Sequence, residues 1–259
     1  MMEGEHGLAY VTLTAKMMEQ FGVAAEPLYY CGGNNDNHTC SGCENSTKPY
    51  AYKVASGQKY HALDYQVEPD LSAACYFYAM SPLLNIPVIV ENVHFDSMQG
   101  DVAFIRVLEQ MGCTAVDTER GILVNPPANG TFNGVTVDMS AFSDQAITLA
   151  AIAPFAETPT TITGIGHIRL QESDRIHAIC TELSKMGIRC VEGDAEITVY
   201  PGSPKASSVD TYDDHRMAMG FSLIGLRSVE PITINDPYCC EKTFENYFEV
   251  LQEVISKLQ

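Results

Sequence analysis

Apolar residues recur at helical spacing in several stretches of the chain. In the last stretch they fall on one face of a helix with a 3.6-residue period, and they are Phe244, Tyr247, Phe248, Leu251, Val254, Ile255 and Leu258. A middle stretch repeats the pattern with Ile176, Ile179, Cys180 and Leu183, and it ends at Gly187. Glycine suits that position because helices often end in a left-handed residue, which a Cβ atom disfavours. Both stretches therefore predict amphipathic helices.

The same order of elements occurs three times, after Asp70, Asp144 and Asp214. Each aspartate precedes an apolar helical stretch, and a proline then opens a short β-branched run; the runs are Pro87–Val90, Pro159–Ile162 and Pro231–Ile234. A turn residue, a variable loop and a second amphipathic helix follow each run. The helix ends that match are Glu19–Gly22, Glu109–Gly112 and Ser184–Gly187. Residues 1–69 are therefore predicted to hold the tail of an earlier copy.

Short strand pairs are predicted after the second helices. Residues 114–116 would pair with 122–124, and residues 189–191 with 197–199. The alternation of helices and strands predicts an α/β fold with sheets covered by helices. The repeat length of about 70 to 75 residues exceeds the roughly 20 to 50 residues of solenoid repeats. We therefore expect the copies to pack in a closed, pseudo-threefold arrangement.

Composition narrows the class of protein. The 259 residues are 46% hydrophobic, which supports a sizeable core. The formal net charge of -18 argues against nucleic acid as a partner, because that binding depends on Lys and Arg. No stretch approaches the roughly 20 apolar residues of a membrane span, and the first residues lack the pattern of a signal peptide. We therefore expect a cytoplasmic protein that binds neither membrane nor nucleic acid.

The nine cysteines, in a chain without a secretion signal, predict reduced thiols and not a disulfide framework. Cys75 and Cys180 fall within apolar helical patterns. Four candidate zinc ligands lie in a Cys-, Asn- and Gly-rich loop at 31–47; they are Cys31, His38, Cys40 and Cys43. The spacing of Cys31 matches no standard zinc finger, so a simple hairpin insertion is the alternative reading of this loop.

Three charged junctions stand before or within apolar stretches, at Glu172–Arg175, Asp213–Met219 and Glu241–Thr243. A helix N-terminus offers unpaired N–H groups and a partial positive charge, and an arginine there adds a planar set of donors for carboxylate or phosphate. Screening limits exposed charges to a Debye length of about 8 Å, so a few converging cations can dominate a cleft in an acidic protein. These junctions predict one shared anion site.

Four segments carry a family resemblance; they are Ser97-Met98-Gln99-Gly100-Asp101, Glu172-Ser173-Asp174-Arg175, Asp213-Asp214-His215-Arg216-Met217-Ala218-Met219 and Lys242-Thr243-Phe244. In this order they resemble the C-terminal part of EPSP synthase (3-phosphoshikimate 1-carboxyvinyltransferase). The similarity runs in register from about Tyr10 to the end. It implies transfer of the enolpyruvyl group of phosphoenolpyruvate to the 5-hydroxyl of shikimate 3-phosphate, with release of phosphate and without a metal or other cofactor.

The resemblance also implies an architecture. Members of the family have two domains, each an inside-out α/β barrel of three repeated βαβαββ units, with the active site between them. Residues 1–67 resemble the closing segment of the first domain, and residues 68–259 resemble the second domain, with units that start near 70, 144 and 214. The segment that supplies the remaining substrate contacts in the family has no counterpart here, so we expect an incomplete enzyme.

Two carboxylates receive catalytic roles from the resemblance. Asp144 matches the residue that accepts the proton of the sugar hydroxyl, and Glu172 matches the donor to carbon 3 of phosphoenolpyruvate. Each carboxylate could instead have a purely structural role. Asp144 precedes an apolar helix and would serve as its N-cap, while Glu172 would be an acid in the first turn of a helix, three residues before Arg175 and on the same face.

Binding residues follow from the same resemblance. Arg175, Arg216 and Lys242 match the cations that hold phosphoenolpyruvate, and His215 stands beside them either to orient phosphate or as a structural histidine. The residues that match contacts to shikimate 3-phosphate are Asp144, Tyr10, His167 and Gln171. His167 replaces an asparagine of the family, Gln171 replaces a lysine, and Gly7 replaces a serine, so the affinity for this substrate is in question.

Two other functions stay open at this point. One is that of the UDP-N-acetylglucosamine enolpyruvyl transferases, which share the fold, although the segments at 213–219 and 242–244 favour the shikimate branch. The other is a non-catalytic half-protein that binds a partner subunit or an anion. An isolated half would expose the face of the cleft and a sheet edge, so we expect a partner chain, self-association or poor solubility.

Overall fold

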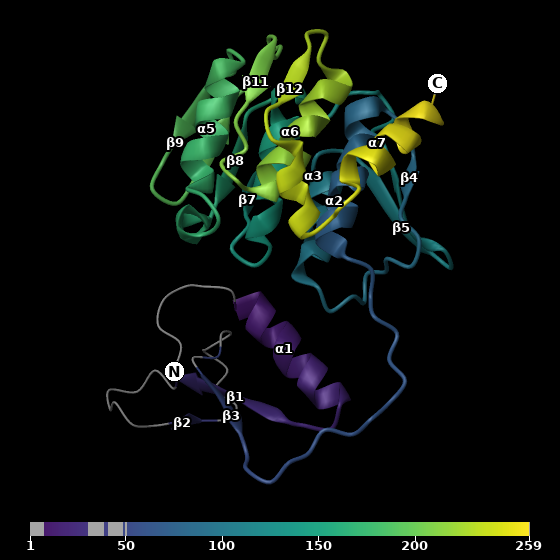
Figure 1. Cartoon of the computed structure of the whole chain (residues 1–259), viewed down its shortest axis with the longest axis vertical. Coiled ribbons are helices and arrows are strands. Elements are labelled where there is room, and N and C mark those ends of the chain that lie inside the picture. The colour runs from purple at the N-terminus through teal and green to yellow at the C-terminus, as the bar shows by residue number, and fades with distance from the viewer. Residues whose placement is uncertain (1–7, 31–38, 41–48, 50, 259) are drawn as a thin grey trace. The chain divides into compact units, whose positions relative to one another are not determined.

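The computed structural model describes residues 8–30, 39–40, 49 and 51–258. The chain divides into two compact units, residues 1–67 and 68–259, which are described separately (Figure 1). Among the helices of the described residues, none combines the length and the apolar character needed to cross a membrane.

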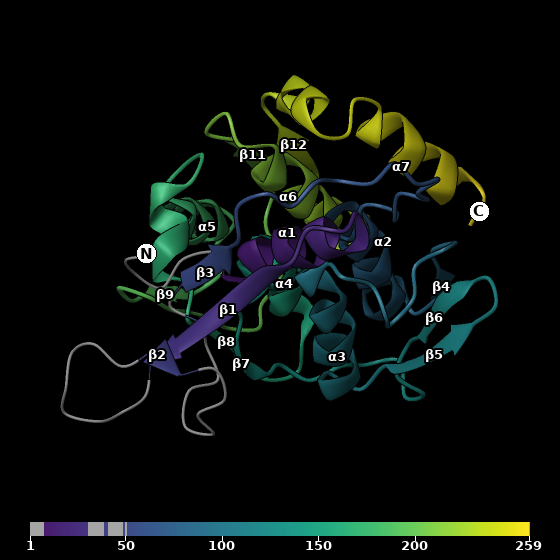
Figure 2. The ribbon, with the colours of Figure 1, turned by 90° about the horizontal axis from the view of Figure 1, so that it is seen from below.

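The first unit is built on one helix and a small antiparallel sheet. Helix α1 (Leu8–Gln20) ends before Gly22, whose φ of +89° lies in the left-handed region. Strand β1 (Ala25–Tyr30) pairs with β3 (Ala51–Val54) along its first part and with β2 (Thr39–Cys40) at its end, as Figure 2 shows. A helix, a left-handed glycine and a strand pair are the elements predicted for the tail of a repeat.

The second unit contains three successive groups of elements. The first group is α2 (Leu71–Leu84), β4 (Val88–Ile89), α3 (Ala103–Gln110), β5 (Thr114–Thr118) and β6 (Gly121–Asn125). The second is β7 (Thr136–Asp138), α4 (Ala146–Ile152), β8 (Thr160–Thr163), α5 (Arg175–Lys185), β9 (Cys190–Glu192) and β10 (Ile197–Val199). The third is β11 (Ser207–Val209), α6 (His215–Arg227), β12 (Ile232–Ile234) and α7 (Tyr247–Ser256). Short 3₁₀ helices span Gly100–Val102, Ser143–Gln145, Ala153–Phe155, Gly166–Leu170 and Pro237–Lys242.

The strands form three small sheets in this unit. One has the order β4-β6-β5 and is antiparallel, and another has the order β7-β8-β10-β9, in which only β7 and β8 are parallel. The third is the parallel pair β11-β12. Both predicted strand pairs are confirmed, since β5 pairs with β6 and β9 pairs with β10. The fold is α/β.

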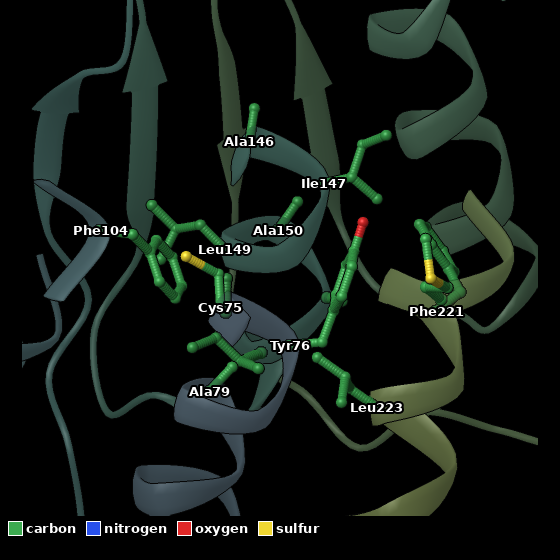
Figure 3. Packing of buried hydrophobic residues seen from close by; sticks show 14 of the residues in the cluster. Cys75, Tyr76, Ala79, Phe104, Ala146, Ile147, Leu149, Ala150, Phe221 and Leu223 are labelled. Carbon is green, nitrogen blue, oxygen red and sulfur yellow. The ribbon is translucent and has the colours of Figure 1, made fainter. Parts of the chain in front are cut away.

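The core of this unit lies where the first helix of each group meets the other two. Figure 3 shows α2, α4 and α6 around a common set of apolar side chains. Those labelled are Cys75, Tyr76, Ala79, Phe104, Ala146, Ile147, Leu149, Ala150, Phe221 and Leu223. Every residue of α4 is buried, as expected for a helix with apolar side chains on all faces. These helices follow the three anchors Asp70, Asp144 and Asp214, so the repeat seen in the sequence shares one core.

The last helix is shorter than its apolar pattern predicted. Helix α7 begins at Tyr247, so Phe244 precedes it and Leu258 follows it. The chain approaches α7 through the 3₁₀ helix Pro237–Lys242, and Thr243, with φ -132°, leaves helical geometry. Phe244 still packs on the core, with its ring 5.5 Å from that of Tyr247, whereas Leu258 is 48% exposed.

Helices α4 and α6 approach closely at Gly220, where a methyl group would lie 2.7 Å from Cγ2 of Ile147. We expect Gly220→Ala to lower the free energy of unfolding by about 1–3 kcal/mol, since the core is too tight for the added group. The matched control is Gly225→Ala in the same helix, where the nearest atom would be 3.7 Å away. It should be neutral or stabilise by up to about 1 kcal/mol. Equal losses of unfolding free energy in the two variants, measured by urea unfolding, would contradict the close contact at Gly220.

Candidate active site

Arg175 is the centre of the site and is almost fully buried. Its side chain is 1% exposed, and its Nε donates to Oδ2 of Asp214 at 2.7 Å. Its Nη1 donates to Oδ1 of Asp144 at 3.0 Å and to the side-chain oxygen of Gln171, and its Nη2 donates to Oε2 of Glu172 at 2.8 Å. One guanidinium therefore joins three carboxylates from separate parts of the chain, which offsets much of the cost of burying its charge.

The start of α5 positions this arginine. Asp174 is the N-cap of the helix, and its carboxylate accepts from the backbone N–H of His177 at 3.0 Å. Arg169 holds the same carboxylate, with its Nη1 2.9 Å from both oxygens. Arg175 is consequently the first residue of the helix, and its side chain is directed away from the exposed Asp174 and into the core.

A second arginine joins the network from α6. Asp214 is the N-cap of α6 and accepts from the backbone N–H of Arg216 at 3.0 Å. The Nη2 of Arg216 lies 2.8 Å from Oδ2 of Asp144. Asp144 thus holds Arg175 with one oxygen and Arg216 with the other, so both guanidinium groups meet on a single carboxylate.

The loop before α6 adopts a strained conformation. Tyr212 and Asp213 have φ values of 58° and 56°, and consecutive left-handed residues other than glycine are uncommon. The Tyr212 hydroxyl donates to Oε1 of the fully buried Glu182 at 2.7 Å, and the backbone N–H of Asp214 donates to the carbonyl of Thr211 at 2.9 Å. These bonds hold the loop in the form that delivers Asp214 to Arg175.

Lys242 reaches the network from the solvent side. Its Nζ lies 3.1 Å from Oε1 of Glu172, and its side chain is 61% exposed. Burial raises the pKa of Glu172, but the charge of Arg175 and the hydrogen bond from Lys242 outweigh it and lower that pKa to about 2. Glu172 is therefore a carboxylate paired with two cations, and it stays ionised well below neutral pH.

The start of α2 lies at the same end of the core. Asp101 is buried and accepts from Nε2 of Gln145 at 2.6 Å and from the Ser72 hydroxyl at 3.1 Å. Burial raises the pKa of Asp101, and the bond from Gln145 opposes the rise. Since Gln145 follows Asp144 directly, the beginnings of α2, α4 and α6 are linked through hydrogen bonds and ion pairs at one edge of the unit.

Two histidines border the site. His167 lies 2.8 Å from the hydroxyl of Ser143 through its Nε2, next to Asp144. His215 is 3% exposed, and neither of its ring nitrogens has a hydrogen-bond partner among the described residues. Burial and the charge of Arg216 lower the pKa of His215, so this ring is neutral at neutral pH.

Comparison with known proteins identifies the family to which this geometry belongs. The family model of EPSP synthase (3-phosphoshikimate 1-carboxyvinyltransferase) matches residues 6–251. The chain belongs to this family. The 3-phosphoshikimate 1-carboxyvinyltransferase of Nostoc punctiforme is 39% identical over 241 residues, and the chloroplastic one of Brassica napus is 41% identical over 252 residues.

Relatives of the EPSP synthase family extend well beyond this chain. The alignments cover 93% and 95% of it but only 51% and 45% of the two relatives, so the chain spans about half their length. Among solved structures, the EPSP synthase of Acinetobacter baumannii superposes with a TM-score of 0.71 at 24% identity, covering 93% of this chain and 53% of that one. This similarity supports the same fold.

Two of the simpler alternatives from the sequence are wrong. Asp144 is not the N-cap of α4, because it lies within the 3₁₀ helix Ser143–Gln145 and the N-cap position of α4 is Gln145. Glu172 is not in the first turn of a helix, because α5 begins only at Arg175. The ion pair between Glu172 and Arg175 joins the loop before α5 to the first residue of that helix, and Arg175 is buried. It is therefore not an exposed pair along one helix face. Lys242 likewise ends a 3₁₀ helix and does not begin α7.

Other predicted residues lie elsewhere or outside the described part. Tyr10 is on α1 in the first unit, with its side chain 43% exposed. Of the candidate zinc ligands, Cys31, His38 and Cys43 lie outside the described residues, and Cys40 is in β2. Across the described segments, no group of three or more His, Cys, Asp or Glu side chains could hold a metal ion. The zinc site stays a prediction.

Sequence reasoning missed the contact of Asp214 with Arg175, because it used Asp214 to mark a repeat and as part of a family segment but gave its side chain no role. The recurrence of aspartate before each first helix was the available signal. It could not indicate that Asp214 would face Arg175, because the two residues are 39 positions apart and meet only through packing of α5 against α6. Asp101 and Gln145 were missed in the same way, since each acts through a partner from another repeat.

The charge of Asp214 should be needed to keep Arg175 buried. We expect Asp214→Asn to lower the free energy of unfolding by about 3 kcal/mol, because asparagine retains the cap but leaves the arginine undercompensated. Asp213→Asn is the matched control, exposed and in a left-handed conformation that asparagine tolerates; it should change stability by less than about 0.5 kcal/mol. Urea unfolding measures both, and similar values for the two variants would refute the assignment.

Glu172 should titrate far below its ordinary value of 4.5. NMR of its side-chain carboxyl is expected to show a pKa of about 2, which Lys242→Met should raise, while Lys257→Met on the exposed end of α7 should not. Since the folded pKa is depressed, the stabilisation is complete above pH 4.5 and is lost as the pH falls toward 2. An unshifted pKa in the wild-type chain would rule out the pairing.

Proposed function

We propose that this chain provides the phosphoenolpyruvate-binding part of an enolpyruvyl transferase that acts on shikimate 3-phosphate and releases phosphate. The observation that carries the proposal is the meeting of Arg175, Arg216 and Lys242 around Asp144 and Glu172. Phosphoenolpyruvate carries a phosphate and a carboxylate, which suit two guanidinium groups and an ammonium group.

The network contains equal numbers of cationic and anionic side chains. Three cations face the carboxylates of Asp144, Glu172 and Asp214. Asp214 and Arg175 are buried and form the fixed part, whereas Lys242 is 61% and Glu172 30% exposed and can rearrange. An incoming anion would compete with Glu172 for Lys242 and with Asp144 for Arg216, so binding would remove one cationic partner from each of these carboxylates, while both keep their pair with the buried Arg175.

This competition gives Glu172 a route to the role of proton donor. Its pKa of about 2 makes it unable to donate at neutral pH while it pairs with Arg175 and Lys242. An anionic substrate that pairs with Lys242 would remove the Lys242 hydrogen bond to Glu172 and place negative charge beside its carboxylate, and both changes would raise the pKa of Glu172. Protonation of Glu172 would thus be favoured only when phosphoenolpyruvate is present to receive the proton at carbon 3.

Asp144 is proposed to accept the proton of the 5-hydroxyl, and Gln171, His167 and Tyr10 to contact shikimate 3-phosphate. The side-chain oxygen of Gln171 accepts from Arg175, and His167 bonds to Ser143 beside Asp144. Gln171 can donate a hydrogen bond to a phosphate or hydroxyl through its amide but supplies no charge. His215 is proposed to fill the space behind Arg216 and orient the bound phosphate.

The proposal extends to the architecture. We assign residues 68–259 to one inside-out α/β barrel of three repeated units that start near 70, 144 and 214, and residues 1–67 to the closing segment of a second. The shared core of α2, α4 and α6 supports the threefold relation. Because the chain spans about half the length of its relatives, the other substrate contacts would come from a further segment or a partner chain.

The alternative is a non-catalytic chain that binds an anion or a partner subunit, and the partial coverage of the relatives favours it. Phosphate release distinguishes the two. The chain is mixed with both substrates, with and without a purified N-terminal half of a full-length relative. Activity in the completed mixture supports the transferase, and its absence there, with phosphoenolpyruvate still bound, supports the alternative.

Binding of phosphoenolpyruvate should depend on Lys242. Calorimetric titration is expected to show affinity reduced about 10- to 100-fold in Lys242→Met, since a charge-assisted hydrogen bond contributes about 1.5–3 kcal/mol. Lys257→Met, an exposed lysine at the end of α7, should bind like the wild type. Unchanged affinity in Lys242→Met, or equal losses in both variants, would place the anion elsewhere.

A further inference from the structure

Two cysteines that the proposed reaction does not use lie in contact with each other. Cys180 is on α5 and Cys190 begins β9, and their Sγ atoms are 2.6 Å apart. Both are free thiols. Figure 1 shows α5 beside β9, at the edge of the sheet β7-β8-β10-β9.

The fold between the two residues creates this contact. Helix α5 ends near Met186, Gly187 turns the chain with a φ of +75°, and the backbone N–H of Ile188 bonds back to the carbonyl of Leu183 at 2.9 Å. The chain then returns along the helix as β9, which its pairing with β10 holds in place. A disulfide joins two sulfurs at about 2.05 Å, so the thiols need to approach by only about half an ångström.

We propose that Cys180 and Cys190 are a disulfide-forming pair, which a peroxide oxidises to a bond that ties α5 to β9. Oxidation begins at Cys190, which is partly exposed beside the 46% exposed Val191, whereas Cys180 is 6% exposed. The Cys190 sulfur attacks one oxygen of the peroxide and becomes a sulfenic acid, with release of one water. Cys180 then attacks that sulfur, and the second water leaves. Two thiols lose two electrons and two protons, and hydrogen peroxide is reduced to two waters.

The surroundings make the reaction slow, and this sets the conditions of the test. The hydrogen bond with Cys180 and burial both raise the pKa of Cys190, so little thiolate is present at neutral pH. Excess peroxide and incubation for hours are therefore required. The helix concerned also carries Arg175, five residues before Cys180, so the bond would anchor the element that positions the buried arginine.

The sequence around the pair allows an unambiguous readout. Trypsin cleaves after Arg175, Lys185, Arg189 and Lys205, so Cys180 and Cys190 are released on separate peptides, 176–185 and 190–205, each with a single cysteine. The whole folded chain is treated with hydrogen peroxide or with dithiothreitol, alkylated with N-ethylmaleimide and digested. Mass spectrometry then detects the two peptides joined, two hydrogens lighter than their sum.

The joined peptides are expected in the oxidised folded chain and not in the reduced chain. Their absence after oxidation, or their appearance only when the chain is oxidised in urea, would overturn the proposal.

Oxidation should also raise the melting temperature by about 5 °C, because the bond closes a loop of about ten residues. Cys180→Ser and Cys190→Ser should lose this rise. Cys239 is a partly exposed cysteine outside the pair, so the Cys239→Ser variant should keep the rise in melting temperature. The peptide readout stands without any variant and does not depend on the proposed catalysis.

Discussion

The burial of the Arg175 guanidinium among carboxylates is the constraint around which the second unit is organised. A charge with 1% exposure is tolerated only when several hydrogen-bonded counter-charges surround it, and removal of one of them leaves a large uncompensated cost. The counter-charges come from the beginnings of α4 and α6 and from the loop before α5. These segments must therefore meet at one place for the fold to be stable.

The apolar core and the ion network together fix the positions of the helices. Close packing of α2, α4 and α6 sets where the helices begin, and the hydrogen bonds of Asp101, Gln145 and Asp144 join those beginnings. Buried ion pairs seldom add stability beyond what apolar residues of the same size would provide. Their presence at the edge of a well-packed core is instead typical of a site where charge is needed for binding or proton transfer.

In the proposed function, the same arrangement would link substrate binding to protonation. The pKa of Glu172 is low because Arg175 and Lys242 hold its carboxylate, and Lys242 is a group with which a phosphorylated acid would pair. The partly exposed side of the network, with Lys242 and Glu172, can respond to a ligand, while Asp214 and Arg175 remain fixed within the core. Rigid and adjustable charges thus occupy different depths of one site.

The sequence by itself determined the elements, the repeat and the identity of the charged residues. Apolar periodicity and proline positions predicted strands β4, β8 and β12, because local chain geometry is governed by neighbours within a few residues. The family resemblance singled out Asp144, Glu172, Arg175, Arg216 and Lys242, because several short segments match in the same order. Local pattern also predicted roles that were wrong, such as the capping role of Asp144 and the helical position of Glu172.

Only the tertiary structure decided which of these charges face each other, since Asp214 and Arg175 are 39 residues apart and Glu172 and Lys242 are 70 apart. Such contacts depend on how whole helices pack together, and the periodicity of apolar residues along the chain does not predict that packing. The contact between Cys180 and Cys190 has the same origin, because the turn at Gly187 brings a strand back along a helix. Burial and charge pairing, which set the pKa of Glu172, arise only after that packing is complete.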